Sequence, residues 1–379
     1  MSISTSDDRR EFPAVTDEEL EKLRSMIGQP VRSDRPHVAE LTPDAIRHYA
    51  YGIGDRNPLW TDPGYAPAHG RPQGAPPTAL LAMDKVFSGY VTGLPGIHAM
   101  YAGASFRFER PIVAGDRLSG NAFLAELIER PSRFAGRSWQ QIYEVPFTDP
   151  DGNLVCTGRS YCFRIERDSA REAKKYDEIQ VRWTPEQIDE IAQRYLDEEA
   201  RRRGNVPRFV EDVAVGDRLP QITKGPYTAT TAIAYLLGWG GLYVRAHADA
   251  FDLYRRHPAL AIPNEWGVPE PPERVHWDPD LARRVGVPGA YDYGPERVSW
   301  MGHVVTDWMG DDGFLRTLDV QVRRHNVLGE LVTCWGEVTE VDTATRTVTV
   351  QLMATNQDGH ESARGTAEVV LPSSAGSGA

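Results

Sequence analysis

The hydrophobic and polar positions of this chain follow the same order of patterns twice. In both halves, alternating apolar and polar residues are broken first by a glycine followed by an acidic residue and later by Asp-Gly. The alternating regions are 105–130, 145–165, 318–341 and 350–371, and the breaks lie at Gly115-Asp116, Asp151-Gly152, Gly329-Glu330 and Asp358-Gly359. Alternation predicts strands with one buried face, and Asp-Gly between such runs is a strong hairpin signal. We therefore predict a duplicated antiparallel unit.

Each half also predicts two helices ahead of its strands. Residues 42–55 open with Thr42 as N-cap, and Pro43 stands at the first helical position. Their counterpart, residues 228–241, opens with Thr228. The next two helices are expected at 75–89 and 295–310, beginning near Pro76 and Gly294. Two helices followed by antiparallel strands is the order expected of an α+β unit whose sheet wraps a central helix.

The repeat divides the chain into two domains with a segment between them. Residues 168–204 are rich in charge, which favours a solvated helical linker, and the last residues are a Ser/Gly-rich tail. The expected divisions are 1–167, 168–204, 205–371 and 372–379. The second half also carries a Pro-rich stretch with aromatic residues at 251–274. Long aperiodic loops are often functional, so we expect this stretch to cover a ligand tunnel, the alternative being a solvent-exposed meander.

Composition narrows the class of protein. The 379 residues are 40% hydrophobic and 25% charged, as in globular proteins, and the formal net charge is −12. An acidic chain argues against a nucleic-acid partner. The three cysteines have no metal-ligand spacing, and Cys156 and Cys162 are expected on one strand. The N-terminus lacks a signal-peptide pattern and no apolar run approaches membrane length, so we expect a cytoplasmic protein with no membrane association.

Residues 51–66, YGIGDRNPLWTDPGYA, resemble the signature of the MaoC-like (R)-specific enoyl-CoA hydratases and acyl dehydratases. That signature reads Gly-Asp-x-Asn-Pro-aliphatic-His-x-acid, and Asp55, Asn57 and Asp62 match it. Trp60 stands where the family has its histidine. This half resembles the N-terminal FAS1-like dehydratase type of hotdog domain.

Residues 275–294, VHWDPDLARRVGVPGAYDYG, resemble the same signature from its histidine onward. His276 and Asp278 match, while the Asp-x-Asn-Pro part is missing. If Gly241 corresponds to Asp55, about 30 extra residues precede His276. The family's helix-opening His-Gly is here Tyr293-Gly294. The resemblance covers residues 15–371 and implies a double hotdog, with each antiparallel sheet wrapped around a central helix.

The resemblance implies reversible hydration of a 2-enoyl-CoA to a 3-hydroxyacyl-CoA. A carboxylate and an imidazole share the proton transfers, and a backbone N–H at a helix start stabilises the thioester oxygen. The expected catalytic residues are Asp55, His276 and Asp278, and the expected substrate-binding residues are Asn57, Gly74, Tyr293, Gly294 and His247.

Each assignment has a structural alternative. Asp55 and Asp278 could only form turns, His276 could be an ordinary loop histidine, and Tyr293 could be structural. His247 begins a second His-x-acid pattern, but nothing after it continues the signature. His303 and Asp307, one helical turn apart, are expected to serve packing.

Two other functions fit the same residues. One is a catalytically degenerate acyl-CoA-binding module that needs a partner subunit. The other is a hotdog thioesterase using a helix carboxylate such as Asp84 or Asp307. No clustered Cys/His ligands and no dinucleotide loop are visible, so no metal and no cofactor is expected. The expected partner is an acyl-CoA or acyl carrier protein thioester, and the sequence leaves a homo-oligomer open.

Overall fold

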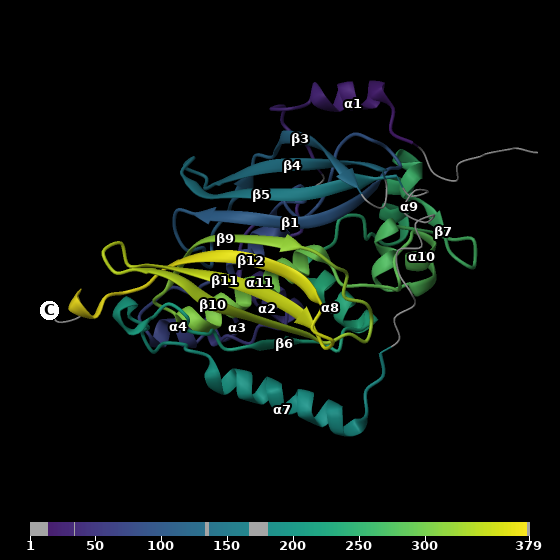
Figure 1. Ribbon diagram of the computed structural model, residues 1–379. Coiled ribbons are helices and arrows are strands. Elements are labelled where there is room, and N and C mark those ends of the chain that lie inside the picture. Colours follow the sequence, from purple (N-terminus) through teal and green to yellow (C-terminus); the bar gives the residue numbers. More distant parts are fainter. Residues whose placement is uncertain (1–13, 34, 133–135, 167–180, 377–379) are drawn as a thin grey trace, which may run out of the picture.

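The described part of the chain forms two similar halves that share one sheet. The computed structural model describes residues 14–33, 35–132, 136–166 and 181–376. Its strands form one antiparallel sheet of ten, in the order β2-β4-β5-β1-β9-β12-β11-β10-β6, with β3 beside β4 (Figure 1). The strands of the first half are β1 His98–Phe108, β2 Ser119–Gly120, β3 Phe123–Ser132, β4 Gly136–Thr148 and β5 Leu154–Ile165. Those of the second half are β6 Ile222–Lys224, β9 Phe314–Val322, β10 Val332–Asp342, β11 Thr347–Asn356 and β12 Glu361–Val370.

The two halves join through β1 and β9, which pair antiparallel from Gly103 opposite Gln321 to Arg107 opposite Thr317. Gly103 has a φ of +136°, and a side chain there would lie 2.0 Å from the Val320 carbonyl oxygen. Only glycine fits this close approach of two backbones. The sheets of the two halves therefore continue edge to edge, and Cys156 and Cys162 both lie on β5 as expected.

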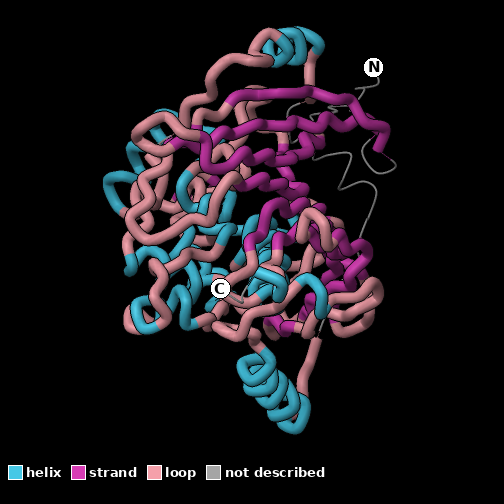
Figure 2. Tube along the Cα trace, turned by 90° about the vertical axis from the view of Figure 1, so that its left-hand side faces the viewer, coloured by secondary structure: helices cyan, strands magenta, loops and turns pink. Residues whose placement is uncertain are grey.

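Helices gather on one side of this curved sheet (Figure 2). The helices of the first half are α1 Asp17–Arg24, α2 Pro43–Gly52, α3 Pro58–Thr61, α4 Tyr65–Ala68, η1 Pro77–Ala79 and α5 Leu80–Met83. The main helices of the second half are α8 Ala229–Trp239 and α11 Gly294–Met309. The predicted N-caps are confirmed, because the Thr42 hydroxyl accepts from the Ala45 N–H and the Thr228 hydroxyl from the Thr231 N–H.

The central helix of the first half is shorter than the sequence predicts. We expected one helix over 75–89, but η1 and α5 end at Met83. Asp84 then takes an extended conformation, and its carboxylate accepts from the Phe87 N–H. Aspartate competes with the helix by binding backbone groups in this way. The second central helix starts at Gly294 as predicted, and all its residues from Pro295 to Met309 are buried.

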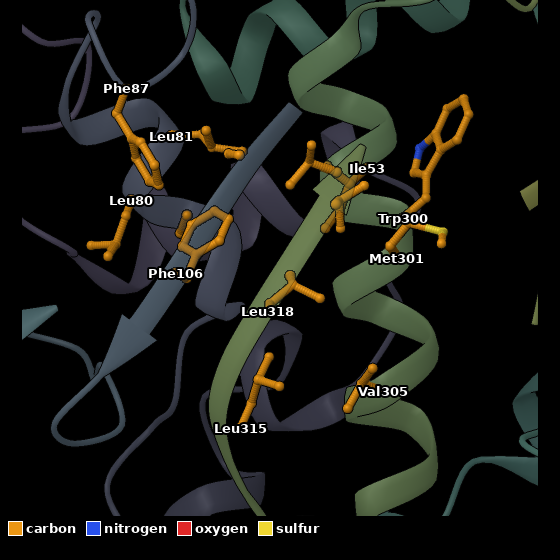
Figure 3. Close-up of a cluster of buried hydrophobic side chains, with 14 of the residues drawn as sticks. Ile53, Leu80, Leu81, Phe87, Phe106, Trp300, Met301, Val305, Leu315 and Leu318 are labelled. Atoms are coloured by element: carbon orange, nitrogen blue, oxygen red, sulfur yellow. The ribbon is translucent and has the colours of Figure 1, made fainter. Parts of the chain in front are cut away.

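The core runs across the junction between the halves. Figure 3 shows Leu80, Leu81 and Phe87 of the first half on one side of β1 and β9, and Trp300, Met301 and Val305 along α11. Phe106 on β1 and Leu318 on β9 are 2% and 0% exposed. One apolar cluster therefore contains residues of both halves, which ties the halves into one folding unit.

The segment between the halves contains α7 Pro185–Arg201, a largely exposed helix that packs beside β6 (Figure 1). The expected division at 167/168 and the last residues, 377–379, lie outside the described residues, while η5 Ser374–Gly376 falls in the expected tail. The domain limits therefore stay a prediction.

The Pro-rich stretch and its surroundings fold into short helices and one short strand pair. These are α9 His247–Arg256, η3 Pro258–Leu260, β7 Ile262–Pro263 paired with β8 Pro269–Glu270, η4 Pro272–His276 and α10 Pro279–Arg284. The short η2 spans Val210–Asp212. Among the described residues, no helix is long and apolar enough to cross a membrane.

Candidate functional site

The first signature segment places Asp55 in the interior, 1% exposed. Its Oδ1 accepts from the Asn57 N–H at 2.9 Å, and its Oδ2 accepts from the Trp60 indole N–H at 2.8 Å. Asn57 is also buried, and its side chain caps α3 by accepting from the Leu59 N–H at 3.0 Å. The indole that replaces the signature histidine therefore donates to the signature aspartate and leaves no imidazole at that position.

An imidazole reaches Asp55 from the other half. His303 on α11 places its Nε2 3.4 Å from Asp55 Oδ1 and 3.2 Å from Asp307 Oδ2. Its Nδ1 lies 2.9 Å from Lys224 Nζ, which also donates to the Ile53 carbonyl at 2.7 Å. An Nε2 that faces two carboxylates must carry a proton, so the Lys224–His303 pair holds at least one positive charge.

The charges of this buried cluster balance. Arg202, just after α7, donates to Asp307 at 2.9 Å. Burial alone would raise the pKa of Asp307, but His303 and Arg202 outweigh it, and the net shift of the pKa is downward. Asp55 and Asp307 are thus matched by Arg202 and the Lys224–His303 pair. Buried charges persist when they are paired and hydrogen-bonded in this way.

The same cluster has the spacing of a metal site. Ligand atoms of Asp55, His303 and Asp307 lie within 4.8 Å of one another. A divalent cation here would have to coexist with the positive charges of Arg202 and the Lys224–His303 pair. Because the carboxylates are already neutralised, the donor set fits a structural ion network better than a metal centre.

The second signature segment places His276 at the end of η4, half-buried beside the start of α11. Its Nδ1 donates to the Tyr291 carbonyl at 2.7 Å, and its ring stacks on Tyr293 with 3.7 Å between ring centres. Desolvation lowers its pKa to about 4. The imidazole is therefore neutral near pH 7, with its proton on Nδ1 and a lone pair on Nε2, which is the form a general base requires.

The start of α11 lies next to this histidine. Tyr293 is the N-cap residue, and its buried hydroxyl has no hydrogen-bonding partner among the described residues. Gly294 follows, and a side chain there would meet the Tyr101 ring at 2.6 Å. The N–H of the first helical residue has no acceptor within the helix and carries the positive end of the helix dipole. Because glycine has no side chain, both Tyr101 and a ligand can approach the backbone at this position.

The two signature residues lie at different points of α11. Asp55 contacts His303, whereas His276 contacts Tyr293. Ten helical residues separate Tyr293 from His303, a rise of about 15 Å. Asp55 and His276 share no hydrogen-bonding partner, so the geometry describes two separate sites rather than one acid–base pair.

The remaining expected site residues have local structural partners. Asp278 caps α10 by accepting from the Asp280 and Leu281 N–H groups, and it pairs with Arg274 at 3.0 Å. His247 is exposed at the start of α9 with a φ of +54°. Gly74 packs beside Trp60, and the N–H of the next residue, Ala75, donates to the Ile112 carbonyl. Their functional roles stay predictions.

Sequence reasoning assigned His303 and Asp307 to packing, while the structure brings both to Asp55. Their spacing of one helical turn on the central helix was the available signal, since it places two polar side chains on one buried face. An open pocket of about 360 Å³ lies elsewhere, at the outer ends of α2 and α8, lined among others by His37, Glu40, Asp44 and His48. It contacts neither signature segment.

Comparison with solved structures identifies the fold of this protein. A MaoC-like dehydratase structure superposes with a TM-score of 0.63 at 21% identity, covering 92% of this chain and all of the other. A MaoC domain protein dehydratase from Chloroflexus aurantiacus gives 0.54 at 14% identity, covering 92% and 95%. The chain thus has the double hotdog fold of the MaoC-like dehydratases, as the sequence predicted.

The family follows from sequence relatives. The FAS1-like dehydratase domain region matches residues 25–157. A UPF0336 protein from Parafrankia sp. is 31% identical over 153 residues, which are 39% of this chain and 95% of that protein. Another from Saccharopolyspora erythraea is 34% identical over 127 residues, 32% of this chain and 78% of that protein. The chain belongs to the family of these UPF0336 proteins.

Proposed function

We propose that this protein catalyses the reversible addition of water to a 2-enoyl-CoA, giving a 3-hydroxyacyl-CoA, and that the working site lies at the start of α11. The observation that carries the proposal is the state of His276. Its Nδ1 is fixed by the Tyr291 carbonyl, its pKa is lowered to about 4, and it stacks on the residue that precedes the helix start. A neutral imidazole beside free helical N–H groups suits proton transfer next to a developing oxyanion.

The proposed roles follow from the chemistry of hydration. Nε2 of His276 takes a proton from water as its oxygen attacks C3 of the enoyl group. Charge then develops on the thioester oxygen, and the Gly294 N–H at the positive end of α11 stabilises it. Tyr293 lies between these two groups and has a buried hydroxyl to offer to the substrate. The thioester, carried by CoA or by an acyl carrier protein, is the expected partner of this site.

The first signature segment has another role in this proposal. Asp55, Trp60, His303 and Asp307 are all at most 5% exposed, and they contact one another by the Trp60–Asp55 hydrogen bond and by ion-pair distances of 3.2 to 3.4 Å from His303 to the two carboxylates. That arrangement favours a structural function for the first signature segment. The sequence-based prediction that Asp55 acts in catalysis is the competing outcome.

The test compares two histidine variants of the full chain with crotonyl-CoA and a longer enoyl-CoA. His276→Asn keeps a donor near the Tyr291 carbonyl but removes Nε2, so we expect hydration to fall by about 100- to 10,000-fold. His360→Asn, in the exposed hairpin between β11 and β12, is the matched control and should keep wild-type activity.

Two results would contradict the proposal. Retention of activity by His276→Asn within threefold would remove the histidine from the mechanism. A wild-type chain that binds 3-hydroxybutyryl-CoA in calorimetry but hydrates neither enoyl-CoA would instead support an acyl-CoA-binding module without its own activity.

A further inference from the structure

The second half lacks the signature aspartate, and the structure shows what occupies its place. Gly238 and Gly241 stand as far after Thr228 as Gly52 and Asp55 stand after Thr42. This correspondence is also spatial. A side chain at Gly52 would meet the Ala234 carbonyl and Tyr235, and one at Gly238 would meet the His48 carbonyl and Tyr49. The helices α2 and α8 therefore pack as equivalent partners, and Gly241 is the position equivalent to Asp55.

A carboxylate from elsewhere in the chain lies at Gly241. A Cβ atom built on Gly241 would be 3.1 Å from Oε1 of Glu273. The Glu273 carboxylate accepts from the Leu242 N–H at 2.9 Å and from the Tyr243 N–H. Glu273 is only 6% exposed. The Glu273 carboxylate thus lies next to the position that the Cβ atom of an aspartate at 241 would occupy. Backbone N–H groups just after α8 hold it there.

Glu273 and His276 belong to the same short helix. Both lie on the 3₁₀ helix η4, three residues apart. Side chains at i and i+3 eclipse one another in a 3₁₀ helix, so the two project from the same face. The backbone of η4 is fixed by Arg274, which pairs with Glu270 at 2.7 Å and with Asp278 at 3.0 Å. The insertion of about 30 residues thus places a carboxylate and an imidazole on the same face of one short helix.

We propose that Glu273 is the carboxylate that works with His276, replacing the signature aspartate that the second half lacks. This inference rests on the proposed hydratase function and names its second catalytic residue. An independent observation points to a ligand here: the Tyr293 hydroxyl, on the ring that stacks on His276, is buried and has no partner among the described residues.

The proposed step balances as follows. The oxygen of water forms a bond to C3, and its proton passes to Nε2 of His276. The C2–C3 double bond becomes single, and C2 takes a proton from the carboxylic acid of Glu273. The imidazolium then returns its proton to the Glu273 carboxylate, which restores both groups. Burial raises the pKa of Glu273, against the lowering effect of the Leu242 and Tyr243 N–H groups and of the Lys85 and Arg245 charges.

The experiment removes the carboxylate at position 273 and restores one at position 241. Glu273→Gln should lower crotonyl-CoA hydration at least 100-fold, while Glu265→Gln, an exposed glutamate of the same insertion, should leave it unchanged. Glu273→Ala should be equally inactive, and adding Gly241→Asp should recover at least tenfold of the loss. Gly241 has a φ of +64°, which aspartate adopts more readily than most residues. Circular dichroism and urea unfolding check that each variant folds.

A second measurement separates this inference from the proposed function. In protein carrying ¹³C-labelled glutamate, the Glu273 carboxyl signal, identified by its loss in Glu273→Gln, should move when 3-hydroxybutyryl-CoA is added. If wild-type protein hydrates crotonyl-CoA and Glu273→Gln does so within threefold, the inference is wrong and the hydratase function stands. If wild-type protein hydrates nothing, the function fails, and an unmoved Glu273 signal overturns the inference as well.

Discussion

The two ends of α11 differ in how their polar groups are satisfied. At the His303 end, Asp55 accepts from Trp60 and Asp307 accepts from Arg202, while His303 Nε2 faces both carboxylates at 3.4 and 3.2 Å without forming a hydrogen bond to either. At the Gly294 end, Nδ1 of the half-buried His276 donates to the Tyr291 carbonyl, and Tyr293 has a hydroxyl with no partner among the described residues. Equivalent positions of a duplicated unit have become a buried ion network on one side and, on the other, a polar site with an uncharged hydroxyl that is unpartnered in the described part of the chain.

The substitutions that separate the halves explain this difference. Trp60 occupies the position of the signature histidine. Its indole N–H donates a hydrogen bond to the Asp55 carboxylate. Gly241 occupies the position of the signature aspartate and has no side chain. The carboxylate of Glu273, which belongs to the insertion, lies in the space that this leaves. A satisfied polar cluster contributes stability and specificity, whereas an unsatisfied one has a cost that a ligand can offset. The comparison therefore supports our proposal that the first site serves stability and the second serves chemistry.

The largest effect should come from breaking the charge balance of the first site. Lys224→Met removes one member of the Lys224–His303 pair and its hydrogen bond to the Ile53 carbonyl, which weakens the balance against Asp55 and Asp307, so we expect a loss of about 3–5 kcal/mol in the free energy of unfolding. Urea denaturation followed by tryptophan fluorescence measures it. A change below about 1 kcal/mol would mean that the network does not stabilise the fold.

Asp55→Asn completes this test. Added to Lys224→Met, it restores the balance of charge and should recover part of the lost stability, in a double-mutant cycle. Alone, it keeps the turn that binds the Asn57 N–H, and activity per folded molecule should stay within threefold of wild type. Strong loss of activity in a folded Asp55→Asn protein would instead support a catalytic Asp55.

Hydration should depend on pH through the second site. His276 must be neutral to accept a proton, and its pKa is lowered to about 4. Activity should therefore be retained as pH falls through the ordinary range of histidine near 6.5 and be lost only near pH 4, about tenfold per further unit. The profile of kcat/KM for crotonyl-CoA, measured over the range in which the protein stays folded, checks this. An acidic limb near pH 6.5 would contradict the desolvated histidine.

Much of the fold could be predicted because its signals are local. Thr42 and Thr228 cap the two equivalent helices, and alternation with Asp-Gly turns marks the strands. The first central helix was predicted too long because the contact that ends it, from the Asp84 carboxylate to the Phe87 N–H, competes with a helix-like pattern.

The candidate site was harder to predict, since its partners are distant in sequence. His303 meets Asp55 across the junction of the halves. Glu273 lies far along the chain from Gly241, and the insertion hides their contact. The motif located His276 and the helix start at Gly294, but no spacing rule could show which carboxylate lies beside them.

The smallest expected effect concerns metals. Asp55, His303 and Asp307 could chelate a cation by their spacing, yet Arg202 and the Lys224–His303 pair already offset both carboxylates. A divalent cation would raise the net positive charge of a buried cluster, which is unfavourable at low dielectric. Prolonged dialysis against EDTA should therefore leave both the unfolding midpoint and crotonyl-CoA hydration unchanged. A midpoint that falls on dialysis and returns with one metal, in wild type but not in His303→Gln, would show that the first site binds that metal. It would then be a metal centre, and the contrast between the two ends of α11 would have to be redrawn.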